Sequence, residues 1–229
     1  MTEQTIAPDP RVLPDVSALR IGVLGGTGEQ GRGLARRLAL AGQQVSIGSR
    51  DAARAAGIAG DVGLGVVGLS NGECARWSDV VIVAVPWDGH AALLESLREE
   101  LAGKIVVDCV NPLSFDKQGA FALRVEEGSA AEQAAGILAD SRVVAAFHHI
   151  SAVLLLDETV DVIDTDVLVL GDEREATDIV QALAGRIAGI RGIFGGRLRN
   201  AGQVEAMTAN LISMNRRYKV HAGIRVTDV

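Results

Sequence analysis

The chain has 229 residues, of which 48% are hydrophobic and 3% aromatic, so a sizeable core would be built mostly from Ala, Val, Leu and Ile. The formal net charge of −7 argues against a general nucleic-acid-binding protein. The two cysteines provide neither a disulfide framework nor metal-ligand spacing, which predicts no metal site. No apolar run is long enough to span a bilayer and no targeting signal is recognisable, so we expect a cytoplasmic protein without a membrane partner.

Apolar runs alternate with helical patterns along most of the chain. Residues 1–17 are polar and proline-bearing, and we expect them to form a flexible extension. Strands are expected at residues 19–26, 43–50, 60–70, 79–86, 104–111, 142–151, 165–172 and 191–196. Helices are expected at residues 29–42, 51–57, 71–78, 89–103, 129–141, 173–189 and 200–220, with a loop at 112–128.

This alternation predicts an α/β fold: a doubly wound, mostly parallel Rossmann-type sheet with helices on both faces. We expect residues 18–165 to form a nucleotide-binding domain and residues 166–229 a small C-terminal α/β appendage around the long final helix. Residues 186–229 carry eight basic and two acidic side chains, which fits a solvated face, an anionic ligand or a partner subunit. Ligands of such sheets bind at the carboxyl ends of the strands.

A glycine fingerprint follows the first expected strand. Gly26, Gly28 and Gly31 match G-x-G-x-x-G between a strand and a helix, the context in which this pattern binds dinucleotides. The first glycine permits a tight turn, the second lets backbone amides approach a pyrophosphate, and the third packs the helix on the strand. The alternative is a glycine-rich turn without a ligand.

Ser49 and Arg50 stand where NAD-binding proteins carry an acid that bonds the adenosine ribose. A guanidinium and a hydroxyl at that point favour a 2′-phosphate, and hence NADP over NAD. Arg54 would lie on the same side if residues 51–57 are helical, whereas Asp51 could serve the helix N-terminus instead. The alternative is an exposed arginine without a specific role.

Two later features could complete the site. Trp87, with Ala91 one helical turn later, could cover the inner half of the cofactor or fill a gap in the core. His148 and His149 are neighbours in an expected strand, so at most one of them should face a shared pocket. Both could instead be hydrogen-bonded structural histidines.

In combination these motifs resemble those of the coenzyme F420-dependent NADP reductases. The matching stretches are collinear from about residue 19 to 207 and read LGGTGEQGRGLARRLA, GSR, VPW, KIVVDCVNPL, AFHHISA and VLVLGD. The resemblance implies direct, reversible hydride transfer between C5 of the deazaflavin and C4 of the NADP nicotinamide. Such an oxidoreductase holds its two small-molecule co-substrates in contact and uses no catalytic side chain.

The resemblance also implies where the two cofactors bind. For NADP it implies contacts from Thr27, Gly28, Glu29 and Gln30 in the turn, beside Gly26 and Gly31 of the fingerprint, from Ser49, Arg50 and Arg54 at the 2′-phosphate, and from Trp87, Ala91 and Ala152 along the cofactor. His148 and Ile150 would border coenzyme F420. Two alternatives remain: an NADP-dependent reductase of a small imine or carbonyl compound, and a non-catalytic NADP-sensing protein. The apolar final helix predicts a homodimer.

Overall fold

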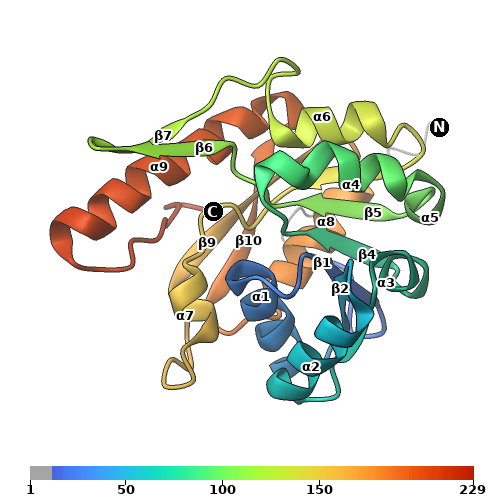
Figure 1. Ribbon diagram of the computed structural model, residues 1–229. Helices are drawn as coiled ribbons and strands as arrows, with labels where there is room; N and C mark the ends of the chain where they lie inside the picture. Colours follow the sequence, from blue (N-terminus) through green and yellow to red (C-terminus); the bar gives the residue numbers. More distant parts are fainter. Residues whose placement is uncertain (1–11) are drawn as a thin grey trace, which may run out of the picture.

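The computed structural model describes residues 12–229, and one large sheet runs through it (Figure 1). Its strands lie in the order β10-β9-β8-β5-β4-β1-β2-β3, and neighbours are parallel except β8 and β9. The predicted doubly wound, mostly parallel sheet is therefore confirmed. The strands are β1 (Arg20–Leu24), β2 (Gln44–Ser49), β3 (Val67–Ser70), β4 (Val80–Val83), β5 (Ile105–Asp108), β8 (Arg142–Ala145), β9 (Thr165–Gly171) and β10 (Ile190–Gly196).

Helices cover both faces of this sheet (Figure 1). One face carries α1 (Glu29–Leu40), α2 (Ala52–Val62), α7 (Ala152–Leu156) and α8 (Arg174–Ala184). The other face carries α3 (Asn71–Trp77), α4 (His90–Ser96), α5 (Arg98–Leu101), α6 (Ala130–Ile137) and α9 (Ala201–Tyr218). Two short 3-10 helices, η1 (Trp87–Gly89) and η2 (Leu198–Asn200), precede α4 and α9.

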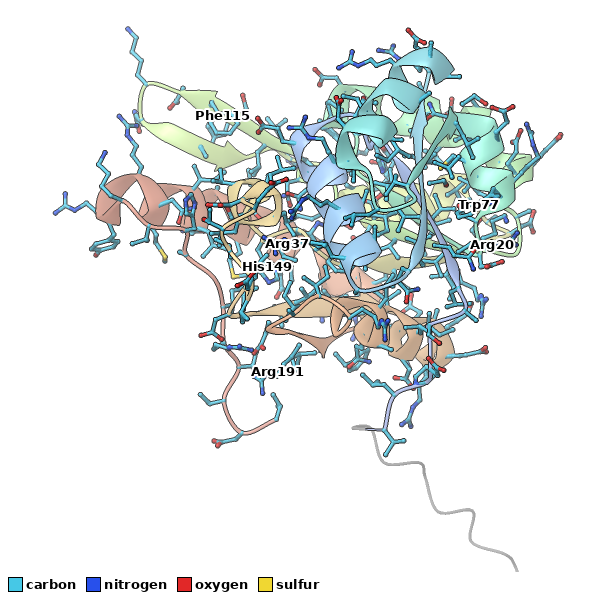
Figure 2. All side chains as sticks on the ribbon, turned by 90° about the horizontal axis from the view of Figure 1, so that it is seen from below. Arg20, Arg37, Trp77, Phe115, His149 and Arg191 are labelled. Carbon is cyan, nitrogen blue, oxygen red and sulfur yellow. The ribbon has the colours of Figure 1, made fainter. Side chains whose placement is uncertain are left out.

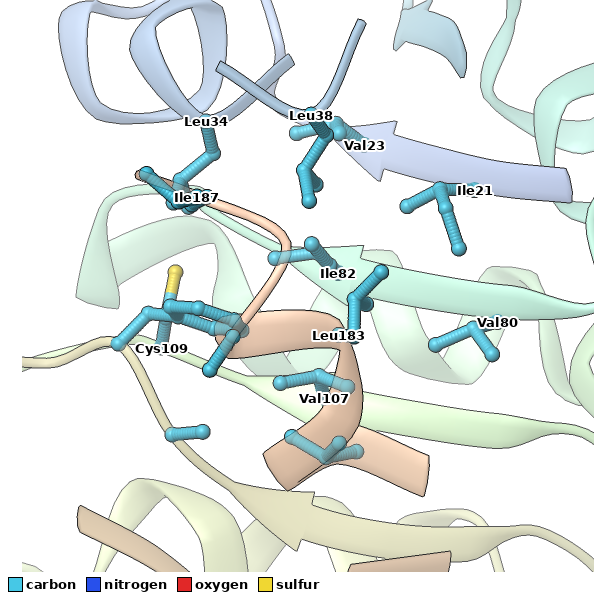
Figure 3. Close-up of a cluster of buried hydrophobic side chains, with 14 of the residues drawn as sticks. Ile21, Val23, Leu34, Leu38, Val80, Ile82, Val107, Cys109, Leu183 and Ile187 are labelled. Carbon is cyan, nitrogen blue, oxygen red and sulfur yellow. The ribbon is translucent and has the colours of Figure 1, made fainter. Parts of the chain in front are cut away.

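The core lies between the central strands and these helices. β4 and β5 are buried along their whole length, as expected of parallel strands that are covered on both sides. On one face, Ile21 and Val23 of β1 and Ile82 of β4 pack with Leu38 of α1 and Leu183 of α8 (Figure 3). Burying aliphatic side chains in this way is the main favourable contribution to folding.

Residues 112–128 are not the expected uniform loop. β6 (Leu113–Asp116) and β7 (Gly119–Ala122) form an antiparallel hairpin that packs against α9. The Asp116 carboxylate accepts hydrogen bonds from the backbone N–H groups of Gln118 and Gly119, and Gly119 has a φ of +127°. These local bonds close the turn, which the mixed polar and aromatic sequence did not reveal.

The expected strand over residues 142–151 is also shorter than predicted. β8 ends at Ala145, because Phe147 adopts a left-handed φ of +64° and turns the chain. β9 overlaps β8 by only two residue pairs, Val144 with Gly171 and Ala145 with Leu170, so most of β9 extends past the carboxyl end of β8.

β9 and β10 belong to the predicted C-terminal appendage, yet they pair with the same sheet as the preceding strands. The segment after α9 returns to β9, where the buried Asp166 accepts hydrogen bonds from Arg191, Arg225 and the backbone N–H of Val226. The Arg191 guanidinium holds the pKa of this carboxyl well below its usual range. Two of the eight basic side chains counted in residues 186–229, Arg191 and Arg225, are thus used in contacts within the chain. The division at residue 165 stays a prediction.

Residues 1–11 of the predicted flexible extension lie outside the described residues. Val16, from the same predicted segment, is 3% exposed, and its carbonyl accepts a hydrogen bond of 2.9 Å from Gln43 Nε2. Between residues 12 and 229, none of the helices combines the length and apolar character needed to cross a bilayer.

Candidate functional site

The turn between β1 and α1 is as tight as the glycine fingerprint predicts. Gly25 has a φ of +75°, a conformation that glycine adopts without steric cost. A Cβ at Gly31 would lie 2.8 Å from the carbonyl oxygen of Gly25, so only glycine permits this approach of helix and turn. A Cβ at Gly28 would meet that oxygen at 3.4 Å, an ordinary contact. The space over Gly28 is therefore open for a ligand.

The other residues of the turn surround the N-terminus of α1, where backbone N–H groups favour an anion. Gly26 is buried under Ile47, Thr27 is half-buried and Glu29 is exposed in the first helical turn. Gln30 reaches further, since its Nε2 donates a 3.3 Å hydrogen bond to the carbonyl of Phe147. Gln30 thus connects the turn with the segment that follows β8.

Ser49 and Arg50 lie beside this turn, and Arg54 follows in the first turn of α2. Ser49 ends β2, which pairs with β1, and Arg50 and Arg54 are exposed at the start of α2. Asp51 is the N-cap of α2, and its carboxylate accepts a 3.1 Å hydrogen bond from the backbone N–H of Arg54. Asp51 therefore caps the N-terminus of α2, which was the alternative considered from the sequence. The side chains of Arg50 and Arg54 remain on the surface.

A cavity of about 350 Å³ opens at the carboxyl ends of the central strands, within the size range of small-molecule sites. Its walls come from α1, the ends of β4 and β5, the segment after β8, α9 and the returning C-terminal segment. Of the predicted site residues, the cavity brings together Gln30, His148, Ile150 and Ala152. The remaining glycine-turn and arginine residues lie outside its lining.

The two histidines differ from the sequence-based interpretation. They lie beyond β8, in the turn that Phe147 starts, and both line the cavity, so the expectation that at most one faces a shared pocket was wrong. His149 Nε2 bonds the carbonyl of Asp166 at 2.7 Å, as a structural histidine would. His148 is 3% exposed, and within the described residues neither of its ring nitrogens has a hydrogen-bond partner.

Burial lowers the pKa of His148 to about 4, so its ring is neutral near pH 7. A neutral imidazole offers one N–H donor and one acceptor nitrogen. A buried polar atom without a hydrogen-bond partner is energetically unfavourable. A ligand that bonds this ring would therefore provide the hydrogen bonds that the ring nitrogens lack within the protein. The His148 carbonyl is fixed separately, by Asn111 Nδ2 at 2.8 Å and Thr208 Oγ1 at 3.2 Å.

Trp87 and Ala91 lie after β4, outside the cavity lining. The Trp87 ring stacks on His90, with centroids 5.5 Å apart. His90 is fully buried, with Nε2 2.6 Å from Asp108 Oδ2. Despite desolvation, this carboxylate raises the pKa of His90. The Trp87 ring therefore stacks on a histidine that Asp108 holds in place, and its half-buried side chain lies near the end of β4.

Comparison with known proteins shows the family to which the chain belongs. A family model described as NADP oxidoreductase, coenzyme F420-dependent, matches residues 20–112. An F420-dependent NADP reductase from Methanothermobacter marburgensis is 43% identical, with 92% of this chain and 99% of the relative covered. One from Methanocaldococcus jannaschii is 38% identical over the same shares of the two chains. The chain belongs to the F420-dependent NADP reductase family.

One solved structure agrees with this assignment, and a second shares the fold. The structure of a candidate F420-dependent NADP reductase from Arthrobacter sp. FB24 has a TM-score of 0.79 and 25% identity, and it covers 92% of this chain and 100% of the other. A pyrroline carboxylate reductase from Plasmodium falciparum has a TM-score of 0.59 at 13% identity, covering 90% of this chain and 66% of the other. The second likeness shows the fold alone.

Several residues of this family member's cavity were not predicted from the sequence as site residues. They are Asn111, Thr208, Asn215 and Ala222, which come from three separate segments. Asn111 follows a buried strand at the ligand-binding edge, and this position was the one signal that could have identified it. The others reach the cavity only through the tertiary placement of α9 and the C-terminal segment.

Proposed function

We propose that this protein transfers a hydride between reduced coenzyme F420 and NADP, in either direction. The glycine turn, Ser49 with Arg50, and the cavity all lie at the carboxyl ends of the parallel strands, the edge at which ligands of such sheets bind. When bound, the cofactors supply the chemistry, a hydride passing between deazaflavin C5 and nicotinamide C4. The observation that carries the proposal is the cavity that joins Gln30 of the glycine turn to the unpartnered His148.

NADP is expected to occupy the turn and the adjoining surface. The residues proposed to bind it are Gly26, Thr27, Gly28, Glu29, Gln30, Gly31, Ser49, Arg50, Arg54, Trp87, Ala91 and Ala152. The amides at the start of α1 would bond the pyrophosphate, and the two arginines would bond the 2′-phosphate. Gly28 supports this placement, because its missing side chain leaves the approach to those amides open.

Coenzyme F420 is expected beside His148 and Ile150. The neutral His148 ring can bond a polar edge of the deazaflavin, while Ile150, only 5% exposed, gives an apolar surface. The backbone at His148 is held from behind, since the carbonyls of Phe147 and His148 accept three side-chain hydrogen bonds. Rigid walls of this kind keep two reacting carbons at the contact distance that hydride transfer requires.

We further expect a homodimer in the cytoplasm. Exposed apolar side chains gather on the β6–β7 hairpin and the end of α9, where Phe115 is 66% and Tyr218 70% exposed. Figure 2 shows Phe115 on the hairpin where it projects from the body of the molecule. Apolar patches of this kind mark interaction surfaces, and a second copy is the commonest partner. The cytoplasmic location remains a prediction from the sequence.

One assay tests the proposed reaction. Purified protein is mixed with NADPH and oxidised F420, and the loss of the deazaflavin's visible absorbance is followed. We expect turnover that depends on both cofactors and reverses with reduced F420 and NADP. NADPH binding without F420 turnover would contradict the proposal and favour a reductase of another substrate or an NADP sensor.

A further inference from the structure

Helix α1 has a second role beyond the dinucleotide turn at its start, because its body packs closely along α7. Gly33 makes this approach possible, since a Cβ there would lie 2.6 Å from Leu155 Cβ. α7 directly follows the turn that carries His148 and Ile150, and its first residue, Ala152, lines the cavity. The position of α7 therefore determines the position of one cavity wall.

Arg37 of α1 lies against the end of α7, and it is a charged side chain that is only 6% exposed. Figure 2 shows it in the interior of the molecule, where α1 meets the chain around α7. Its guanidinium donates to four main-chain carbonyls, those of Leu154 at 2.6 Å, Leu155 at 2.9 Å, Asp157 at 2.9 Å and Val160 at 2.6 Å.

The carbonyls of Leu154 and Leu155 are among the acceptors that the end of α7 leaves without intrahelical partners, and those of Asp157 and Val160 belong to the chain that follows. A cation is favourable there because the C-terminus of a helix carries partial negative charge. α7 has only five residues and could not hold its position by its own backbone hydrogen bonds. The planar fork of Arg37 replaces those missing bonds with charge-assisted ones.

The same helix holds the other end of this segment. Gln30 Nε2 donates to the carbonyl of Phe147, ten residues before the carbonyl of Asp157 that Arg37 binds. The cavity-lining residues from His148 to Ala152 lie between the two attachments. One helix therefore braces the segment at both ends, with Gln30 near the dinucleotide turn and Arg37 in the last helical turn.

We propose that Arg37 is a positioning residue for the F420 half of the cavity: by fixing α7 on α1, it sets where His148 and Ile150 stand relative to the nicotinamide. This inference rests on the proposed function. Arg37 itself touches neither cofactor. Its loss should therefore disturb the F420 side and leave the adenosine half of the NADP site intact.

The test compares Arg37→Ala with Arg36→Ala. Arg36 is the neighbouring arginine of the same helix, and its partner, Glu158 at 3.5 Å, is an exposed carboxylate. In the ligand-free protein we expect Arg37→Ala to speed amide hydrogen exchange across residues 147–160 and not across residues 20–31. The KM for F420 should rise by a factor on the order of 10 to 100, because small displacements of a positioned group are costly. The dissociation constant for NADPH should rise much less than this KM, because Ala152 is the one proposed NADP contact between residues 147 and 160 and the proposed pyrophosphate and 2′-phosphate contacts lie elsewhere.

Two further measurements separate positioning from general destabilisation. Free guanidinium at millimolar concentration should restore the KM for F420 in Arg37→Ala and have no effect on wild type or Arg36→Ala. If Arg37→Ala does not fold, Arg37→Lys carries the same exchange and KM readouts, because lysine keeps the charge and loses the planar fork. Unchanged exchange over 147–160, an unchanged KM for F420, or an equal loss of F420 and NADPH binding would each overturn the inference.

The proposed reaction is tested in the wild-type protein, whereas the positioning role of Arg37 is tested in the variants, so the two can be contradicted separately. If wild type neither binds nor turns over F420, the proposed function is wrong, and the exchange experiment still reports on the brace between α1 and α7. If wild type is active and only the expected change in the Arg37 variants is missing, the positioning role is wrong and the proposed function stands.

Discussion

The role that we propose for Arg50 is to select between two coenzymes. Arg50 is exposed at the end of β2, directly beside the strand that leads into the glycine turn. NAD and NADP differ at the adenosine ribose, where NADP carries a 2′-phosphate. A guanidinium offers that phosphate a paired, charge-assisted contact and gains nothing comparable from a hydroxyl.

We therefore predict that Arg50→Ala weakens NADP binding roughly 10- to 150-fold, the loss of one charge-assisted hydrogen bond. NAD binding should change by less than about threefold, the scale of a neutral surface substitution. Calorimetric titration of the variant with both coenzymes measures the two effects. Arg98→Ala, an exposed arginine of α5, serves as the control and should alter neither. Equal weakening of NAD and NADP would contradict the 2′-phosphate assignment.

Sequence reasoning at this scale succeeded where a residue's role depends on its neighbours in the chain. The close contacts of Gly31 and the capping function of Asp51 both follow from local sequence. Phe147 did not, because a bulky residue with positive φ is unfavourable on its own. Its conformation is held by bonds from distant residues, Gln30 to its carbonyl and Asn111 to the next one, and no local pattern encodes those bonds.

Helices α6 and α9 are joined through a buried carboxylate. Glu205 of α9 is 2% exposed and accepts hydrogen bonds from the backbone N–H groups of Ala130 and Ala131, at the N-terminus of α6. Those donors favour the charged form, but burial dominates and raises the pKa of Glu205 to about 7, with the nearby Asp108 adding to the rise. The folded protein therefore holds a proton on Glu205 that the unfolded chain releases near pH 4.5.

This difference predicts how stability depends on pH. A raised pKa means that the folded state binds the proton more tightly, so the contribution is present below about pH 4.5 and lost as the pH rises to about 7. The free energy of unfolding should fall by about 3 kcal/mol across that interval from this group. Glu205→Gln should remove the fall, because the amide does not titrate. Urea unfolding between pH 4.5 and 8 measures it.

The matched control is Glu158→Gln, since the Glu158 side chain is 81% exposed and pairs with Arg36 at 3.5 Å on the surface. Its pH profile should follow wild type. A Glu205→Gln protein that kept the full wild-type slope between pH 4.5 and 7 would show that Glu205 is ionised throughout.

At the scale of elements, the parallel strands and the helices between them were predictable because each carries a continuous apolar run or a 3.6-residue pattern. The β6–β7 hairpin and the wall formed by α9 were not predicted, since each takes its place through contacts with the other. β8 was predicted too long because the apolar residues after Ala145 are buried in a turn. Burial alone does not distinguish a strand from a well-packed turn.

An exposed apolar patch on the hairpin and α9 is the proposed contact of the predicted dimer. Phe115 of β6, Met214 and Tyr218 of α9, and Val220 after it are exposed on the hairpin and helix that extend from the sheet. Exposing several large apolar groups together is unfavourable for an isolated chain. A two-fold contact would bury the same patch of both subunits.

We predict that Phe115→Asp yields a monomer, because the substitution places a charge in the contact on both copies at once. Light scattering coupled to gel filtration measures the mass. Phe194→Asp is the matched control: Phe194 is 53% exposed on β10, away from the hairpin, and its variant should stay dimeric. A monomeric wild type, or dissociation by both substitutions, would refute this choice of interface.

The two-pair overlap of β8 with β9 also has a consequence for the family. β9 extends past the end of β8, and the carbonyl of its Asp166 accepts a hydrogen bond from His149 Nε2, so the pairing register of β9 helps set the position of the cavity-lining segment. A slip of two residues would keep every side chain of β9 on its own face and move the Asp166 carbonyl by about 7 Å along β8. A change in the register of this one strand would therefore alter the proposed F420 side of the cavity without changing any residue of the glycine turn.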